Sequence, residues 1–325
     1  PELKEAIYEV SAFPIRDDKE EIVAYAGIGR DVSAQRLAQE ALATRARHEE
    51  GLAACSQALL TETDTRSAIE KALRHLLEAF DVSRVYLNEL APGATDMADA
   101  AQTIEVCAPG IEPQMDNPDL LDKSVREAFR GWEEAMAQGK HVGGIVRDFP
   151  EPIRRILELQ DIVSILVMPL TIEGRHAGLI GFDDCKRERV EAEEDIRLMR
   201  TAAEMIGAFL TARRVQEALR VSEERFRNLV ENATDVIYSV DSQGCFSYIS
   251  PQFFDVTGYH PEELMGRPVH ELQPHEHAEE PHETWLADVL SGKVDRVMGD
   301  QFTLKTKSGE ERWFVSNISV GRDDE

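Results

Sequence analysis

Histidines are the side chains in this sequence with the clearest potential for metal chemistry, and most of them gather in one stretch. His275 and His277 form a His-x-His pair that can hold a transition metal. The surrounding segment, HEHAEEPHE, is polar and contains a proline, which favours a solvated loop. Structural metal sites need several ligands that converge in space, and this spacing does not supply them. The sequence therefore predicts no metal site. The histidines of the stretch are His260, His270, His275, His277 and His282.

Catalytic motifs are absent from the sequence. It contains neither the GxxxxGK[ST] loop that cradles phosphates nor the GxSxG turn that presents a serine nucleophile. The cysteines are far apart and include no CxxC pair, so we expect no disulfide framework and no zinc site, and reduced thiols are the default. We predict that this segment is not an enzyme and has no catalytic residue. The cysteines are Cys55, Cys107, Cys185 and Cys245.

The acidic composition argues against two classes of partner. The net charge is −26, whereas nucleic-acid binding needs clustered Lys and Arg, and an anionic membrane repels such a surface. The longest apolar run, Ile162–Ile172, is too short to cross a bilayer and predicts a buried strand. No secretory signal pattern is present. We therefore expect no nucleic-acid partner, no membrane segment in this sequence and a cytoplasmic location. A membrane anchor elsewhere in a longer parent stays open.

The middle of the chain contains both predicted helices and predicted strands, and these elements must position any site. Apolar residues at steps of three and four predict an amphipathic helix around Ile69–Leu77, and a second helix carrying Trp132 is predicted over Leu120–Gln138. The last two predicted strands are apolar almost throughout, so we expect them at the centre of a sheet, covered on both faces. This pattern predicts an antiparallel-rich α+β domain. Its predicted strands are residues 82–90, 103–108, 141–146, 163–170 and 176–184.

A long helix is predicted from Glu193 to Asn232. Its apolar residues alternate at steps of three and four, as in a heptad seam, with an interruption between Leu210 and Val215. Two interpretations are open: the seam contacts the same seam of a second copy, or the helix packs against its own domain. Because sustained heptads favour pairing between helices, we expect a homodimer. The predicted signal-helix residues are Ile196, Met199, Ala203, Ile206, Leu210, Val215 and Leu219.

The two ends of the sequence are similar to each other. Residues 8–18, YEVSAFPIRDD, and residues 314–324, FVSNISVGRDD, both place an aromatic-led strand before Arg-Asp-Asp. Strand-like runs at 7–13 and 21–29 predict a hairpin, although too few residues precede it to supply a sheet. Internal similarity of this kind indicates an array of repeated modules. We therefore expect the chain to begin with the end of one module and to stop before the last strands of a second.

Four stretches resemble known families. The segment SEERFRNLVENATDVIYSVDSQGCFSYISPQFFDVTGYHPEELMGRP resembles a PAS domain, and PIRDDKEEIVAYAGIGRDVS resembles the end of one. Between them, VCAPGIEPQMDN and VSILVMPLTIEGRHAGLIGFDD resemble a GAF domain of sensor kinases. The resemblance implies an α+β fold class, with antiparallel sheets, flanking helices and long connector helices. The implied parts are the last PAS strands at 1–33, a connector helix at 34–60, a GAF domain at 61–213, a coiled-coil signalling helix at 193–230 overlapping the GAF end, and a PAS domain lacking its last strands at 223–325.

Both families can hold a small molecule in the concavity of the sheet, so the resemblance implies one pocket in each domain. The alternative for each pocket is ordinary core packing. The implied GAF pocket residues are Cys107, Met115, Trp132, Ile145 and Met168. The implied PAS pocket residues are Tyr238, Phe254, Trp285 and Phe302.

The sequence matches the cofactor-binding motifs of these families poorly. Haem-binding PAS domains carry their axial histidine near the position of His282, but Pro281 precedes it and the spacing differs. Bilin-binding GAF domains attach the chromophore through a cysteine often next to a histidine, whereas Cys107 is followed by Ala-Pro-Gly. The residue set of cyclic-nucleotide GAF domains is missing. We therefore expect neither haem nor a bilin; the sequence requires no cofactor, and the identity of any cofactor is unknown.

The resemblance implies a sensory and signal-transmission segment of PAS-GAF-PAS type in a sensor histidine kinase of a two-component phosphorelay. The implied partners are a second copy bound through helices, an unknown small-molecule ligand, and a kinase or cyclase domain further along the same parent chain. Two alternatives stay open. The parent output can be a diguanylate cyclase, or the segment can be a dimerisation spacer without a ligand.

Overall fold

The protein is described by a computed structural model that covers residues 6–18, 20–90, 100–121, 127–272 and 294–319. The chain divides into two compact units, residues 1–215 and residues 216–325, and each is described by itself. Within the described residues, no helix combines the length and the apolar character that crossing a membrane requires.

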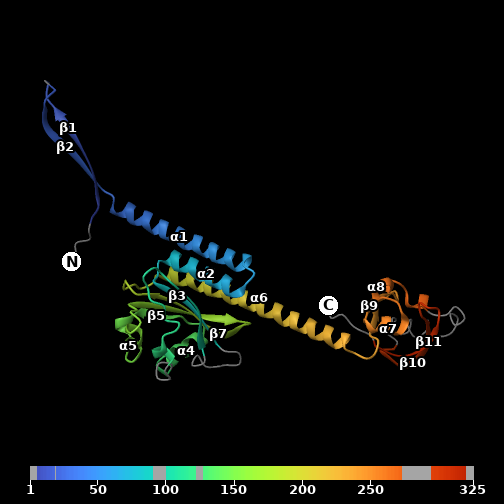
Figure 1. The fold of residues 1–325 in the computed structure, drawn as a ribbon. Coiled ribbons are helices and arrows are strands. Elements are labelled where there is room, and N and C mark those ends of the chain that lie inside the picture. The colour runs from blue at the N-terminus through green and yellow to red at the C-terminus, as the bar shows by residue number, and fades with distance from the viewer. Residues whose placement is uncertain (1–5, 19, 91–99, 122–126, 273–293, 320–325) are drawn as a thin grey trace. The chain divides into compact units, whose positions relative to one another are not determined.

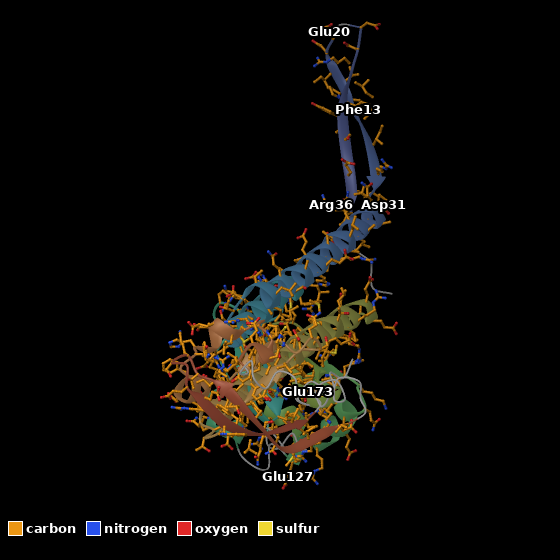
Figure 2. The ribbon with its side chains drawn as sticks, turned by 90° about the vertical axis from the view of Figure 1, so that its right-hand side faces the viewer. Phe13, Glu20, Asp31, Arg36, Glu127 and Glu173 are labelled. Carbon is orange, nitrogen blue, oxygen red and sulfur yellow. The ribbon has the colours of Figure 1, made fainter. Side chains whose placement is uncertain are left out.

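The first unit begins with the predicted hairpin, in which β1 (Tyr8–Arg16) pairs antiparallel with β2 (Ile22–Asp31). These strands pair with each other and with no other described strand, and almost all their side chains are exposed. Figure 2 shows Glu20 at the tip of the hairpin and Asp31 at its other end, beside α1. There Asp31 Oδ1 accepts hydrogen bonds from the backbone N–H and the hydroxyl of Ser33, at 3.0 and 2.6 Å. Asp31 therefore fixes the turn from the hairpin into the helix.

Two helices follow, α1 (Ser33–Thr61) and α2 (Thr65–Phe80). The side chain of Asp64 caps α2 by accepting from Ser67 N at 2.7 Å, and the apolar stripe of α2 is buried, as its spacing predicts. The two helices cross closely at Gly51, where a Cβ atom would lie 2.1 Å from Ala79 Cβ. Glycine at this position therefore allows α1 to lie against α2.

Five antiparallel strands form the sheet of the first unit, in the order β4-β3-β7-β6-β5. The tight turn between β6 and β7 has positive φ at both central residues, Glu173 (52°) and Gly174 (73°), which is the backbone of a two-residue hairpin. The two apolar strands, β6 and β7, lie inside the sheet as predicted. The strands are β3 (Arg84–Leu90), β4 (Ala100–Cys107), β5 (Val142–Ile145), β6 (Ser164–Ile172) and β7 (Arg175–Asp184).

Helices cover both faces of this sheet (Figure 1). On one face α1, α2 and α6 (Glu193–Glu231) enclose the larger core, which contains Leu87, Met168 and Ile206. On the other face a smaller core forms around Val167 and Leu179. The elements on that side are η2 (Pro118–Leu121), α4 (Arg130–Ala137), η3 (Val146–Asp148) and α5 (Ile153–Glu158). The predicted helix Leu120–Gln138 is thus found, within the described residues, as the shorter α4 preceded by η2.

The second unit contains two hairpins and short helices around one core, which includes Phe246, Phe253 and Phe302. The first hairpin turns at Gly244, whose φ of 77° suits glycine, and Asp241 Oδ1 accepts from Gln243 N and Cys245 N. The α+β fold class with antiparallel sheets is confirmed. The elements are β8 (Tyr238–Val240), β9 (Phe246–Ile249), α7 (Gln252–Thr257), α8 (Pro261–Leu264), η4 (Val269–Leu272), β10 (Arg296–Lys305) and β11 (Glu311–Ser319).

Candidate functional site

A buried charged cluster lies on the sheet face opposite α6. Arg84 on β3 is paired in register with Asp183 on β7, and its Nε donates to Asp183 Oδ2 at 2.9 Å. Glu105 on β4 approaches the same Nε at 3.6 Å. All three side chains are at most 2% exposed. Because the neighbours of these residues along their strands point into the core under the helices, strand alternation places the three on one face.

This cluster holds the loops that cover its face. The guanidinium of Arg84 donates to Glu112 O at 3.4 Å and to Gln160 O at 3.5 Å. The carboxylate of Glu105 accepts from Gln114 N at 3.0 and 2.9 Å and from Met115 N at 2.9 Å. Two carboxylates thus share one guanidinium away from water, an arrangement that is stable only while the partners stay together.

The cluster makes stability depend on pH. Burial, opposed by Arg84, raises the pKa of Asp183 to about 6, whereas an aspartate in an unfolded chain titrates near 3.9. Between these values the folded chain binds more protons than the unfolded chain, so this group's contribution to stability falls as pH rises. At about 1.4 kcal/mol per pKa unit, the free energy of unfolding of wild type relative to Asp183→Asn should fall by roughly 2–3 kcal/mol from about pH 4 to about pH 7. Urea titrations of both proteins at several pH values measure this, and a difference that stays constant would refute it.

Of the five predicted GAF pocket residues, Trp132 packs against the smaller core, and Cys107 lies on the same side of the sheet as Glu105. Trp132 packs between Phe129 and Phe149, with ring centroids 4.9 and 5.4 Å away. The backbone of Met115 is held by Glu105, and Ile145 ends β5 half-buried. Cys107 ends β4 half-buried, and burial, with help from Glu105, raises the pKa of its thiol to about 11.

The prediction that Met168 lines the GAF pocket is wrong. Met168 is completely buried in the core under α1, α2 and α6, together with Leu166 and Leu170. Its neighbour Val167 points to the face of Trp132 instead. The reason is the two-residue period of a strand, because an apolar run does not reveal which residues face which side.

Of the predicted PAS pocket residues, two lie in the core of the second unit and one is exposed. Tyr238 packs against Phe246 at 5.9 Å, and Phe302 stacks on Phe314 at 5.7 Å, all in the core of the second unit. Phe254 is not part of that core: it is 41% exposed and stacks on His260 at 4.2 Å, while its neighbour Phe253 is buried. Trp285 lies outside the described residues, as do His275, His277 and His282. Among the described side chains, no three His, Cys, Asp or Glu residues converge on a metal position.

The predicted signal-helix residues also separate into two groups. Met199, Ala203, Ile206 and Leu210 are buried in the core of the first unit, and Ile196 packs against it. For these residues the expected contact with a second copy is wrong, because they already pack against their own sheet and helices. Val215 and Leu219 are 58% and 59% exposed. The break in the heptad pattern coincides with the point where burial ends.

Sequence reasoning missed the charged cluster of Arg84, Glu105 and Asp183. A signal for it was present. Arg84 interrupts one predicted strand and Asp183 ends another that is otherwise apolar, and opposite charges in two buried strands indicate a buried ion pair.

Family comparisons match both ends of the chain. The model described as the PAS fold matches residues 224–325, and the model described as the PAS domain matches residues 4–34. The hairpin β1–β2 therefore lies within a PAS match.

Two curated relatives are named as a regulatory histidine kinase and a sensor. The methanogenesis regulatory histidine kinase FilI of Methanothrix harundinacea is 35% identical over 214 residues, covering 65% of this chain and 24% of the relative. The methyl sulfide methyltransferase-associated sensor of Methanosarcina acetivorans is 24% identical over 272 residues, covering 81% of this chain and 25% of the relative. This chain thus spans about a quarter of the length of each.

Solved structures similar to this chain include bilin-bound domains. A phycocyanobilin-bound GAF domain from a cyanobacterial phytochrome has a TM-score of 0.42 and 12% identity, covering 52% of this chain and 96% of that one. A far-red absorbing protein with bound biliverdin has a TM-score of 0.42 and 13% identity, covering 50% and 98%. These structures overturn the expectation that a bilin plays no part, because bilins are the ligands they contain.

Proposed function

We propose that this chain, which is a PAS and GAF sensory region of a signal-transduction protein, receives a small-molecule signal and passes it along α6 to an output domain of a longer parent. The proposed parent is a cytoplasmic sensor histidine kinase of a two-component system, as the similarity to a histidine kinase supports. The observation that carries the proposal is α6, a single helix of 39 residues that begins in the core of the first unit and continues into the second.

The first half of α6 is joined firmly to the sheet. At Gly207 a Cβ atom would lie 2.3 Å from Thr171 O of β6, so only glycine lets the helix come this close. One turn later, Thr211 Oγ1 accepts from Glu173 N at 3.0 Å in the β6–β7 turn. A change in the sheet therefore displaces α6 rather than being absorbed between loose layers.

A second helix connects directly with α6. The Nδ1 of His48 on α1 lies 3.0 Å from Asp195 Oδ1 on α6, and His48 is 2% exposed. At the other end of α1, Arg213 Nη2 donates to Glu62 O at 2.8 Å. Since α1 follows directly from the hairpin, these contacts supply a route from the N-terminal PAS match to α6.

The second half of α6 is the proposed dimer contact. It carries large apolar side chains on a helix that is otherwise rich in charge, and such a stripe is stabilised by a matching helix. A homodimer would place two copies of this stripe together. The exposed side chains are Val215, Leu219, Phe226 and Leu229, at 58%, 59%, 64% and 68%.

A ligand can drive this relay only if it binds one arrangement of the helices more tightly than another. Native mass spectrometry of the purified chain, before and after incubation with candidate ligands including biliverdin, tests the proposal. We expect a dimer that retains or acquires a small mass. A dimer that never takes up a ligand would favour the spacer interpretation, and a monomer would contradict transmission through paired helices.

A further inference from the structure

A cavity of about 190 Å³ lies where α6 begins, beside the edge strand β5. Its apolar walls include Leu166, Phe182 and Ile196, which belong to or pack against the core under the helices. Ile165 of the smaller core also lines it, so the cavity reaches the edge of the sheet at β5. The glycines of β5, Gly143 and Gly144, contribute no side chain to fill it.

The polar lining of the cavity carries more negative than positive charge. Glu191 and Asp184 line it together with Arg189. The Nε of Arg189 lies 2.9 Å from Glu191 Oε1, and its Nη1 lies 3.8 Å from Asp184 Oδ2. Arg189 Nη1 also donates to Phe80 O at 3.0 Å, which fixes the guanidinium in place. Asp184 has further partners, since its carboxylate accepts from Arg187 and from two backbone N–H groups.

Glu191 is the carboxylate of this lining with the fewest partners among the described residues. Its side chain is 12% exposed, and its ion pair is with Arg189, which Asp184 also approaches. Burial raises the pKa of Glu191, opposed by Arg189, so its ionised form is poorly solvated. The other end of the lining is not basic, because burial and nearby Arg200 lower the pKa of His141. A buried carboxylate of this kind is stabilised by a cation.

The dimensions of the cavity limit the ligand. An apolar cavity of about 150 Å³ accommodates benzene, so this one suits a molecule of roughly five to ten non-hydrogen atoms. We propose that the cavity binds a small alkylammonium ion, with the charged nitrogen beside Glu191 and the alkyl group against Phe182, Leu166 and Ile196.

Occupancy of this cavity bears directly on α6. Glu191 lies two residues before the helix begins, and Ile196 lies in its first turn. A bound cation would therefore fix this end of the helix. That consequence rests on the proposed function, whereas the binding itself does not: a chain that binds the ion yet remains monomeric would contradict the proposed relay and leave the site intact.

Calorimetric titration of the 325-residue chain with n-butylammonium chloride, at constant ionic strength, tests the site. The neutral isostere n-butanol serves as the matched ligand. We expect saturable binding of the ammonium ion and binding at least tenfold weaker for the alcohol. Absence of saturable ammonium binding, or equal binding of both compounds, would overturn the proposal.

Variants locate the binding. Glu191→Gln keeps the shape of the side chain and should weaken n-butylammonium at least tenfold, whereas Glu188→Gln, an exposed carboxylate of the same segment paired with Arg147, should leave it unchanged. Ile196→Trp should fill the cavity and abolish binding. Hydrogen exchange of wild type gives a second measurement that needs no variant, with slower exchange expected at residues 189–196 when the ion is bound. Unchanged exchange there, or equal effects of the two glutamine variants, would place the ion elsewhere and refute the site.

Discussion

Arg84→Met should lower the free energy of unfolding of the first unit by about 3–5 kcal/mol, the usual cost of leaving a buried charge without its partner. Methionine retains most of the volume of the arginine stem but removes the guanidinium that Asp183 and Glu105 share. It also releases Glu112 O and Gln160 O, so the loops over this face lose an anchor. Urea unfolding of the whole chain measures the loss, and hydrogen exchange of the β3 and β7 amides assigns it to this sheet.

Arg74→Met is the matched control for this variant. Arg74 forms an i,i+4 ion pair with Glu70 on the surface of α2, where both side chains are about half exposed. Exposed pairs contribute at most about 1 kcal/mol. Equal losses for the two variants would show that the cluster of Arg84 does not hold the sheet and its loops together.

Gly207→Leu should destabilise the first unit by about 3 kcal/mol, at the upper end of the cost of overpacking. A Cβ atom here would lie 2.3 Å from the backbone oxygen of Thr171, and a backbone atom in an inner strand cannot move aside as a side-chain end can. The helix must therefore lift from β6, which should also speed hydrogen exchange of Glu173 N, whose acceptor is Thr211 Oγ1.

Gly131→Leu is the matched control, and it should not destabilise the protein. Gly131 lies in α4, is exposed, and has open space where a Cβ atom would be placed. Replacing a helical glycine with leucine removes a propensity cost of up to about 1 kcal/mol, so this variant should be neutral or more stable. Calorimetric melting of both variants makes the comparison. A loss for Gly131→Leu as large as that for Gly207→Leu would mean that close contact at Gly207 is not what fixes α6.

The parts of the fold that were predicted correctly carry short-range signals. The inner positions of β6 and β7 follow from their nearly continuous apolar runs, and the buried stripe of α2 follows from its spacing. Burial, by contrast, was assigned to the wrong side for Met168 and to the wrong residue for Phe254. When every residue of a strand is apolar, the sequence does not show which residues point to which face of the sheet. Two consecutive phenylalanines likewise do not show which of the two side chains is buried.

The heptad pattern of α6 could not show which surface its apolar stripe contacts. Steps of three and four describe any helix with one apolar stripe, so the pattern alone cannot distinguish contact with the helix's own sheet from contact with a second copy. The first half of the stripe packs against its own sheet, and Gly207 was the residue that marked this close approach. The cavity beside Glu191 could not be predicted at all, since it depends on how β5, β7 and the start of α6 meet.

Cysteine crosslinking along α6 tests the central claim most directly. The variants Leu219→Cys, Phe226→Cys and Ile206→Cys are prepared in a chain whose partly exposed cysteines, Cys107, Cys185 and Cys245, are replaced by serine. If α6 connects the core to a paired helix, Leu219→Cys and Phe226→Cys form crosslinked dimers under mild oxidation, while Ile206→Cys, fully buried in its own domain, does not. Failure of both exposed positions to crosslink, or efficient crosslinking at position 206, would contradict the account.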